Sequence, residues 1–325
     1  MSTKLTVLAT GGTIAGIAGS AIANDYRAGQ IGIDDYLQQA GGLGLDAELS
    51  GRQIANIDSA DMGPAVWNEL YPAICAALSD EDCDGVIVTH GTDTLEETAF
   101  LLDLTLPSTK PVVVVGAMRP ADAVGYDGMR NFANAVRVAS DPEAAGRGVL
   151  VVMGDRVFAA RDVHKVRTRG TDAFRGFPRE SVALVTPASL DWFGAPWRGD
   201  AGVQFNWADI LPEVPIIYVY AGMEPRTLCR MIDETTRGVV LAGVGEGNMP
   251  DAVRRELARF AEDGLLIVRA SRADEGLVDR EPEDDAIGFV AARALNPQKA
   301  RILLQLLIAN GISDPDAIQA AFDNR

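Results

Sequence analysis

Histidine and cysteine are scarce in this chain, which has two of the first and three of the second. His90 and His164 stand alone, and Cys75, Cys83 and Cys229 are unevenly spaced. Neither set has the paired spacing of a zinc site, and the scattered cysteines fit a reducing compartment better than a disulfide framework. We therefore expect no metal ion and no other cofactor. His90 is instead expected to form hydrogen bonds within the turn that contains it.

Long apolar runs and clustered basic residues are also missing. No stretch of about 18 or more apolar residues occurs, so a membrane-spanning helix is not expected. Lys and Arg number 29 against 46 Asp and Glu, for a formal charge of −17. That charge opposes binding to nucleic acids and to anionic membrane surfaces, because both need clusters of Lys or Arg. The sequence thus predicts neither a nucleic-acid partner nor a membrane partner.

The first residues bear on the compartment. The chain begins MSTK, with one basic residue, and the apolar run that follows breaks at Gly11 and Gly12. Such a run is too short for the core of a signal peptide. We expect a cytoplasmic protein, or a periplasmic or secreted one if a leader has been removed.

The chain does have apolar residues, 47% of its 325, which is enough for two cores. In the first half, apolar runs at 4–9, 85–89, 111–115 and 148–153 alternate with helical patterns at 65–78, 95–104 and 128–140. Apolar strands without polar alternation are typical of a parallel sheet covered on both faces. We therefore predict an α/β fold with a doubly wound, largely parallel sheet in a large N-terminal domain, residues 1–190.

A change of composition separates this region from the rest. Residues 191–214 are rich in Trp, Gly and Pro and indicate a linker. Strands expected at 216–220, 239–242 and 265–269 then alternate with helices expected at 225–234, 250–261 and 297–309. The pattern predicts a smaller α/β C-terminal domain, residues 215–325.

Two apolar runs end in threonine and glycine, in LTVLATGGTIAG (residues 5–16) and VIVTHGTDT (residues 86–94). Such ends place hydroxyl groups and bare backbone N–H groups at the carboxyl edge of a sheet, where open α/β folds bind ligands. A threonine hydroxyl needs a base to become a nucleophile, and Asp93 directly follows Thr92. Either motif alone is typical of a simple turn, but the pair predicts acyl-transfer chemistry.

The segments ATGGTIAG (residues 9–16) and THGTDTLEETA (residues 89–99) closely resemble the two signature segments of the bacterial-type L-asparaginase and glutaminase-asparaginase family. Other similar segments, in family order, are VVVVGAMRP (112–120), RGVLVVM (147–153), AGVG (242–245) and LNPQKAR (295–301). The resemblance implies an amidohydrolase that converts L-asparagine to L-aspartate and ammonia through a covalent threonine acyl-enzyme.

The resemblance also implies roles around the first motif. Thr13 matches the nucleophile, and Tyr26 lies beside it on a Gly- and Ala-rich segment, residues 17–30, that we expect to close over the substrate. Backbone N–H groups beside Gly12 and Thr92 are expected to hold the developing oxyanion.

A second group consists of Thr92, Asp93 and Lys165, the last within ARDVHKV (residues 160–166). A lysine beside Asp93 can accept or relay a proton from a threonine hydroxyl. Sequence does not decide which threonine attacks first, since each has a plausible partner. We take Thr13 as the primary nucleophile.

For the substrate, the resemblance implies that Asp93 binds the α-ammonium and Ser59 the α-carboxylate. The family has Gln or Glu after that serine, but this chain has Ala60. The change removes one polar partner of the ammonium, so we expect L-glutamine to be hydrolysed weakly.

Two further residues match positions that the family contributes from a neighbouring subunit. These are Asn248 and Glu281, with Glu283 as an alternative to the second. The resemblance therefore implies a homotetramer built as a dimer of dimers.

A rival interpretation is a non-catalytic module that binds a nucleotide or senses an amino acid. Glycine-rich turns can bind phosphate at a helix N-terminus. However, residues 10–16 match neither the G-x-G-x-x-G pattern nor a P-loop. For an amino-acid sensor, Ala60 is the one hint.

Overall fold

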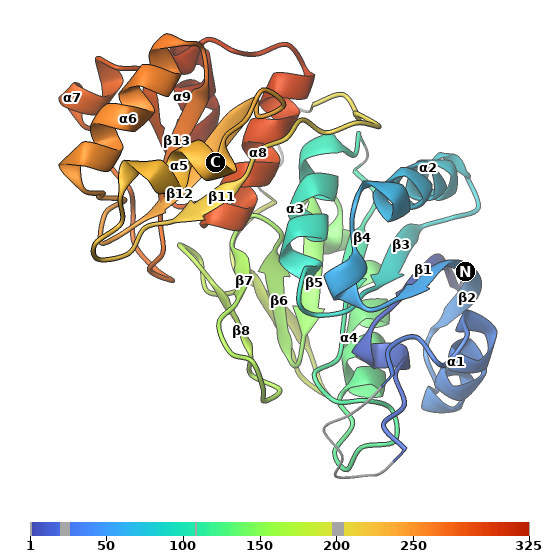
Figure 1. The fold of residues 1–325 in the computed structure, drawn as a ribbon. Helices are drawn as coiled ribbons and strands as arrows, with labels where there is room; N and C mark the ends of the chain where they lie inside the picture. Colours follow the sequence, from blue (N-terminus) through green and yellow to red (C-terminus); the bar gives the residue numbers. More distant parts are fainter. Residues whose placement is uncertain (1, 20–26, 108, 197–204, 325) are drawn as a thin grey trace. The chain divides into compact units, whose positions relative to one another are not determined.

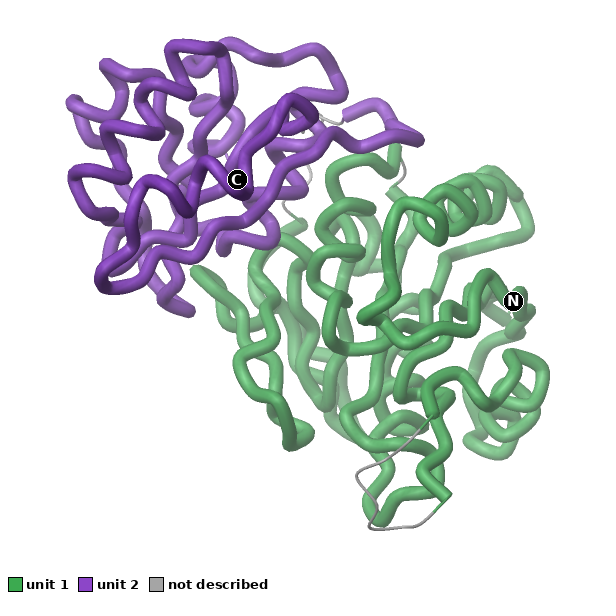
Figure 2. The backbone as a smooth tube through the Cα atoms, viewed as in Figure 1, with its two compact units in different colours: residues 1–204 green, residues 205–325 purple. Residues whose placement is uncertain are grey.

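The computed structural model describes residues 2–19, 27–107, 109–196 and 205–324. The chain forms two compact units, residues 1–204 (unit 1) and residues 205–325 (unit 2), which Figure 2 shows in different colours. The boundary falls inside the segment 191–214 for which we predicted a linker. Strand β10 (Leu190–Trp192) still belongs to the large sheet of unit 1.

Unit 1 contains the first ten strands of the chain. They are β1 (Thr3–Gly11), β2 (Ala47–Ile57), β3 (Gly85–Thr89), β4 (Val112–Val115), β5 (Val149–Met153), β6 (Arg156–Ala159), β7 (Val163–Lys165), β8 (Phe174–Gly176), β9 (Ala183–Val185) and β10. Its helices are η1 (Thr13–Ala15), α1 (Ile33–Ala40), η2 (Gly41–Leu43), η3 (Ser59–Asp61), α2 (Pro64–Ser79), α3 (Leu95–Thr105), α4 (Gly128–Ala139) and η4 (Pro142–Ala144).

The large sheet has the strand order β10-β9-β6-β5-β4-β3-β1-β2 and is parallel from β2 to β5. Successive residues of β1 point to opposite faces: Val7 packs in the cluster that contains α1 and α4, and Leu8 in the cluster that contains α2 and α3. Figure 1 shows these helices on the two faces of the sheet. The predicted doubly wound sheet is confirmed.

The sheet extends beyond the predicted strands at both edges. At one edge, β2 is largely exposed, so its sequence lacks the apolar run that identifies the central strands. At the other edge, β6, β9 and β10 pair antiparallel and are only three or four residues long. Sequence periodicity is weak over such short segments.

Helix α2 has nearly the predicted bounds but a different buried face. Apolar residues recur at intervals of four in this helix, at Val66, Leu70, Ile74 and Leu78, and the last three are buried. Val66 is only half-buried, and Trp67 is buried in its place. The indole N–H of Trp67 donates a hydrogen bond to Thr98 Oγ1 at 2.9 Å, so a polar contact with α3 determines how the first turn is oriented.

Unit 2 is built on a parallel sheet with the order β11-β12-β13-β14. Its strands are β11 (Ile216–Tyr218), β12 (Gly238–Gly243), β13 (Leu266–Ser271) and β14 (Phe289–Ala291). Its helices are η5 (Pro225–Thr227), α5 (Leu228–Met231), α6 (Asp251–Glu262), α7 (Pro282–Asp285), α8 (Pro297–Ala309) and α9 (Pro315–Asp323). A smaller α/β fold was predicted here, and it is confirmed.

The helix predicted at 225–234 is wrong in length. The α-helical part ends at Met231, and Ile232 is extended. Asp233 then accepts hydrogen bonds from the backbone N–H and the hydroxyl of Thr235. This local side-chain turn competes with the helix for the backbone groups and ends it early.

No helix in the described part of the chain is long and apolar enough to cross a membrane.

Candidate functional site

The two Thr-Gly motifs meet at the carboxyl edge of neighbouring strands. Ala9 of β1 pairs with Thr89 of β3, so the pairing of these two strands ends just before the two motifs, at the same edge of the sheet. Beyond that point Gly12 and Gly91 pack backbone to backbone, and a Cβ added to Gly91 would lie 3.2 Å from the Gly12 Cα. Gly12 also has a φ of 81°, which favours glycine. Glycine at both positions is what lets the motifs approach.

His90 holds the second motif in place through a directed chain of hydrogen bonds. Its Nδ1 lies 2.6 Å from the Gly91 carbonyl oxygen, which can only accept, so Nδ1 carries the proton. Its Nε2 then accepts from the Thr98 hydroxyl at 2.9 Å. Burial lowers the pKa of His90 to about 4. The ring is therefore neutral near neutral pH and orients the peptide that precedes Thr92. The hydrogen bonding expected for His90 is confirmed.

Thr92, Asp93 and Lys165 are brought together although 72 or more residues separate the lysine from the other two. Lys165 Nζ donates to Thr92 Oγ1 at 2.8 Å and to Asp93 Oδ1 at 2.5 Å. The lysine is mostly buried, whereas the Asp93 side chain is 60% exposed. An ammonium group thus bridges a buried hydroxyl and a carboxylate that remains accessible.

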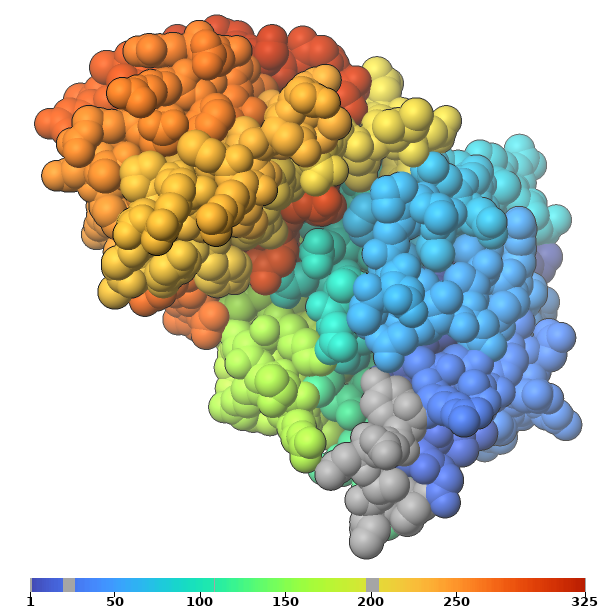
Figure 3. Space-filling model, in the orientation of Figure 1, coloured from blue at the N-terminus to red at the C-terminus, as the bar shows by residue number. Residues whose placement is uncertain are grey.

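Ser59 joins the same group from η3. Its side chain is buried, and its hydroxyl oxygen accepts the backbone N–H of Asp93 at 3.2 Å. Its carbonyl oxygen accepts from the Thr94 hydroxyl at 2.7 Å. Ala60, the departure from the family pattern, is exposed, and its N–H donates to the Asp58 carboxylate. In the space-filling view (Figure 3), the η3–α2 segment, light blue, lies at the surface of unit 1.

Thr13 is 5% exposed and begins η1 directly after Gly12. Tyr26, the residue expected beside it, lies outside the described residues. The described ends of the expected 17–30 segment are tied to unit 1. Ile17 and Arg27 exchange backbone hydrogen bonds, and the Asp122 carboxylate accepts the N–H groups of Ala18 and Gly19, both at 2.8 Å. Closure of this segment over a substrate stays a prediction.

Asn248 and Glu281 both belong to unit 2. Asn248 is exposed and ends a tight turn, where its backbone pairs with that of Val244. The Glu281 side chain is 40% exposed and accepts from Arg269 Nη1 at 3.3 Å. Glu283, the alternative, is exposed on α7.

A buried cation lies behind these two residues. Arg269 on β13 has a side chain only 1% exposed and forms an ion pair with Asp284, which is equally buried. Its guanidinium also donates to the carbonyl oxygens of Asp279 and Glu246, at 2.9 and 3.2 Å. These acceptors lie two residues before Glu281 and two before Asn248. Burial lowers the pKa of Arg269, while Glu281 raises it.

Both units match known family models. The N-terminal asparaginase model covers residues 4–198, and the glutaminase/asparaginase C-terminal domain model covers residues 213–322. The chain belongs to the asparaginase family. The resemblance stated from sequence is thereby confirmed, as is the fold that it implied.

Relatives within the asparaginase family align over nearly the whole chain. A probable periplasmic L-asparaginase of Haemophilus influenzae is 42% identical over 99% of this chain and 93% of its own length. L-asparaginase 2 of Escherichia coli is 41% identical, with 98% and 92% covered. The crystal structure of a probable cytoplasmic L-asparaginase from Campylobacter jejuni has a TM-score of 0.93 at 37% identity, covering 99% of this chain and 100% of its own.

Two charged residues of this asparaginase-family chain were not singled out from sequence. Arg269 interrupts the apolar strand LLIVR, and a charge inside a buried strand is a signal that could have been used. Glu96 is 5% exposed and accepts the backbone N–H of Lys165. It was quoted within the second motif, but Glu97 beside it looks the same in sequence.

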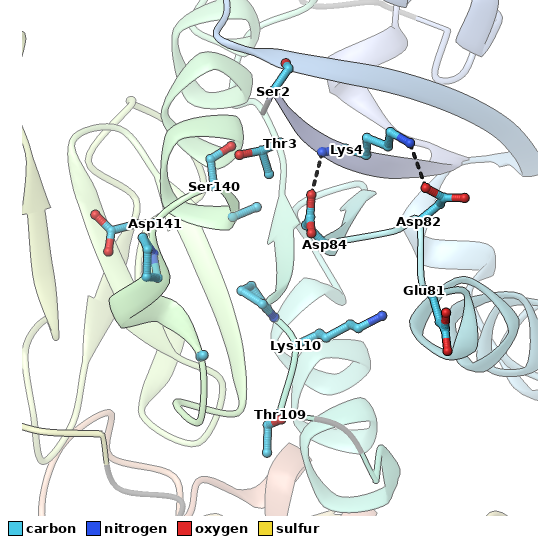
Figure 4. A pocket seen from close by; sticks show the side chains of 14 residues that line it. Ser2, Thr3, Lys4, Glu81, Asp82, Asp84, Thr109, Lys110, Ser140 and Asp141 are labelled. Carbon is cyan, nitrogen blue, oxygen red and sulfur yellow. Dashed lines mark hydrogen bonds and ion pairs between the residues drawn. The ribbon is translucent and has the colours of Figure 1, made fainter.

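A separate hollow lies at the amino-terminal edge of the strands, away from the asparaginase-family motifs. It has a volume of about 640 Å³ and is drawn in Figure 4. Several of its charged groups already have partners: Lys4 pairs with Asp82, the Lys4 backbone N–H donates to Asp84, and Lys110 donates to the Asp80 carbonyl. In the described residues, no cluster of His, Cys, Asp and Glu is suited to hold a metal ion.

Proposed function

We propose that the chain hydrolyses the side-chain amide of L-asparagine to L-aspartate and ammonia through a threonine acyl-enzyme. The observation that carries this proposal is the contact of Lys165 Nζ with Thr92 Oγ1 and Asp93. It places an ammonium between a hydroxyl and a carboxylate. Thr92 directly follows Gly91, the residue that packs against Gly12 of the Thr13 motif. The names of the relatives give the same activity independently.

In the proposed reaction, Thr13 Oγ attacks the side-chain amide carbon and its proton is transferred to the leaving nitrogen, which departs as ammonia. Water then adds to the acyl ester, releases L-aspartate and returns the proton to the threonine. Thr92 and Lys165 relay protons in these steps. Backbone N–H groups beside Gly12 and Thr92 stabilise the oxyanion, a contribution of about 3 kcal/mol in comparable sites. Thr13 remains our assignment for first attack, and Thr92 serves to activate water.

Substrate binding follows from the groups around the lysine. The exposed carboxylate of Asp93 is suited to the α-ammonium, and the Ser59 hydroxyl, beside the Asp93 N–H, to the α-carboxylate. The methyl side chain of Ala60 offers no hydrogen bond at its surface position. We therefore propose that L-glutamine is a weak substrate, although one relative that is 35% identical is named a glutaminase-asparaginase.

We further propose a homotetramer, a dimer of dimers, in which Asn248 and Glu281 of one chain complete the site of a neighbouring chain. Supporting this, both residues are at least partly exposed, and the same buried Arg269 binds Glu281 and the carbonyl oxygen of Glu246, in the turn that ends at Asn248. The cytoplasmic location stays a prediction, since relatives of both locations occur. The same holds for the absence of nucleic-acid and membrane partners.

The activity is tested by ammonia release from L-asparagine, D-asparagine and L-glutamine, assayed side by side without added metal. We expect rapid release from L-asparagine and slow release from L-glutamine. A chain that binds L-asparagine but releases no ammonia would be the amino-acid sensor instead.

Site sharing is tested by mixing two inactive variants. Chains with Thr13→Ala and chains with both Asn248→Ala and Glu281→Ala are unfolded together and refolded, with each variant refolded alone as control. Partial recovery of activity is expected, because some mixed dimers contain one intact composite site. An active monomer in light scattering at assay concentration contradicts the shared site.

A further inference from the structure

Lys165 has little sheet structure of its own to hold it. It ends β7, a strand of three residues whose one partner among the described strands is β8, and together they make a two-stranded sheet. An isolated pair of short strands is only marginally stable. The position of the lysine relative to Thr92 therefore depends on contacts outside this hairpin.

Glu96 supplies such a contact. It lies in the first turn of α3, four residues after Thr92, and its Oε2 accepts the backbone N–H of Lys165 at 2.7 Å. The carboxylate is nearly fully buried. A buried carboxylate is unfavourable unless it is paired and hydrogen-bonded, so this contact is a specific one. The N-terminal turn of a helix also favours a negative charge there.

The contacts of Lys165 form a closed ring. Its main chain is bound by Glu96, and its ammonium is bound by Thr92 and Asp93 from the loop that leads into the same helix. Residues 92–96 thus fix the position of both the main chain and the ammonium of Lys165. A shift of the Lys165 main chain by about 1 Å would break the hydrogen bond of its ammonium to Thr92.

We infer that Glu96 is a positioning residue, which holds the main chain of Lys165 so that the ammonium reaches Thr92 and Asp93. The inference rests on the proposed function for the role of the lysine in turnover. The contact of Glu96 that carries the inference is with the main chain of Lys165 and not with a reacting group. Its effect is transmitted through the lysine.

The first test compares Glu96→Ala with Glu96→Gln, which keeps the length and one accepting oxygen. With L-asparagine, Glu96→Ala should lower kcat about tenfold to a hundredfold, the usual result of a small misplacement, and change KM about threefold or less. Glu96→Gln should retain most of the turnover. Glu97→Gln, on the same turn, is the matched control and should stay within about twofold of the parent. Unchanged turnover in Glu96→Ala, or a loss in Glu97→Gln as large as that in Glu96→Ala, overturns the inference.

A double-mutant cycle then asks whether the effect passes through the lysine. In a Lys165→Met background, Glu96→Ala should lower the residual kcat by less than about twofold, because the group that it positions is gone. The same tenfold or larger loss in that background overturns the inference. Thermal unfolding of each variant checks that the fold persists.

Hydrogen exchange separates this inference from the proposed function. The Lys165 amide should exchange faster in Glu96→Ala than in the parent, and not in Glu97→Gln, because its acceptor is removed. Unchanged exchange overturns the positioning role whatever the activity. Faster exchange together with full activity of Lys165→Met supports the contact and instead refutes the proposed role of the lysine.

Discussion

The region around Thr13 and Thr92 and the region around Asn248 and Glu281 are positioned by different means. In unit 1, two glycines in contact and a neutral histidine set the main chain, and one lysine is the cation at the centre. In unit 2, the buried guanidinium of Arg269 binds the backbone carbonyls of Glu246 and Asp279 and pairs with the buried carboxylate of Asp284. The contrast implies that substitutions in the first region mainly lower turnover, whereas substitutions behind the second mainly lower stability.

The largest effect is expected from the reacting groups of unit 1. Thr13→Ala, Thr92→Val and Lys165→Met should each lower kcat for L-asparagine by about a thousandfold or more, and pairs of them little further, because they act as one unit. Steady-state kinetics with urea unfolding measures both properties. Thr6→Val, at the other end of β1, is the matched control and should stay active. Full activity in Thr13→Ala would remove the nucleophile assignment.

In unit 2 the expected large effect is on folding. Arg269→Met leaves the buried Asp284 with Arg254 as its remaining ion-pair partner and should lower the free energy of unfolding by about 3 kcal/mol, the lower end of the cost of breaking a buried pair. Adding Asp284→Asn should lower stability further, because Arg254 then loses its buried partner as well. Urea unfolding measures both. The exposed pair of Arg280 with Asp285 is the comparison, and Arg280→Met should change stability little. Equal losses at the two arginines would contradict the contrast.

The stability of the folded chain should fall in acid because of His90, the buried histidine of the Thr92 motif. Burial lowers the pKa of His90 to about 4 in the folded chain, against an ordinary value of 6.5. Between these values the unfolded chain binds more protons, so stability falls as the pH falls from about 6.5 to 4, by roughly 3 kcal/mol in all. Urea unfolding at several pH values measures the slope. His90→Gln should remove this share of it, and identical slopes for parent and variant would refute the neutral buried ring.

The smallest expected effect is a gain. Ala60 is exposed and its backbone N–H already binds Asp58, so a longer side chain leaves the turn intact. Ala60→Gln should lower KM, because one added hydrogen bond strengthens substrate binding by on the order of 1 kcal/mol, or slightly more since the partner is charged. Ala60→Met has similar length without the amide and should leave KM unchanged. The same KM in both variants would show that the missing contact is supplied elsewhere.

Local patterns were enough for the centre of unit 1. The apolar strands β1, β3, β4 and β5 and the helices α2, α3 and α4 were predicted within about one residue, apart from the carboxyl end of β1, because each is long or fully buried. The Thr-Gly motifs led directly to Thr13 and Thr92 for the same reason. Neighbouring parallel strands bring their carboxyl ends together without any further information.

Contacts between distant segments were not predictable in this way. Lys165 was assigned by resemblance, and nothing in residues 160–166 alone indicates that its amine reaches Thr92. Glu96 and Glu97 are equivalent in sequence, and only the packing of α3 against β7 decides which of them is buried against the lysine. The exposed strand β2 was missed because its sequence carries no continuous apolar run.

The contact of Gly12 with Gly91 implies that the glycines of this chain differ in how well they tolerate substitution, as a saturation mutagenesis library would show. At Gly41 and Gly42 an added Cβ meets nothing within 4 Å, so most substitutions there should survive selection. At Gly91 the same atom meets the Ser59 side chain at 2.7 Å and the Gly12 Cα at 3.2 Å. Even alanine acts as a wedge between the two motifs. Recombination with a distant homologue should therefore succeed only when both glycine turns come from the same parent or both keep their glycine.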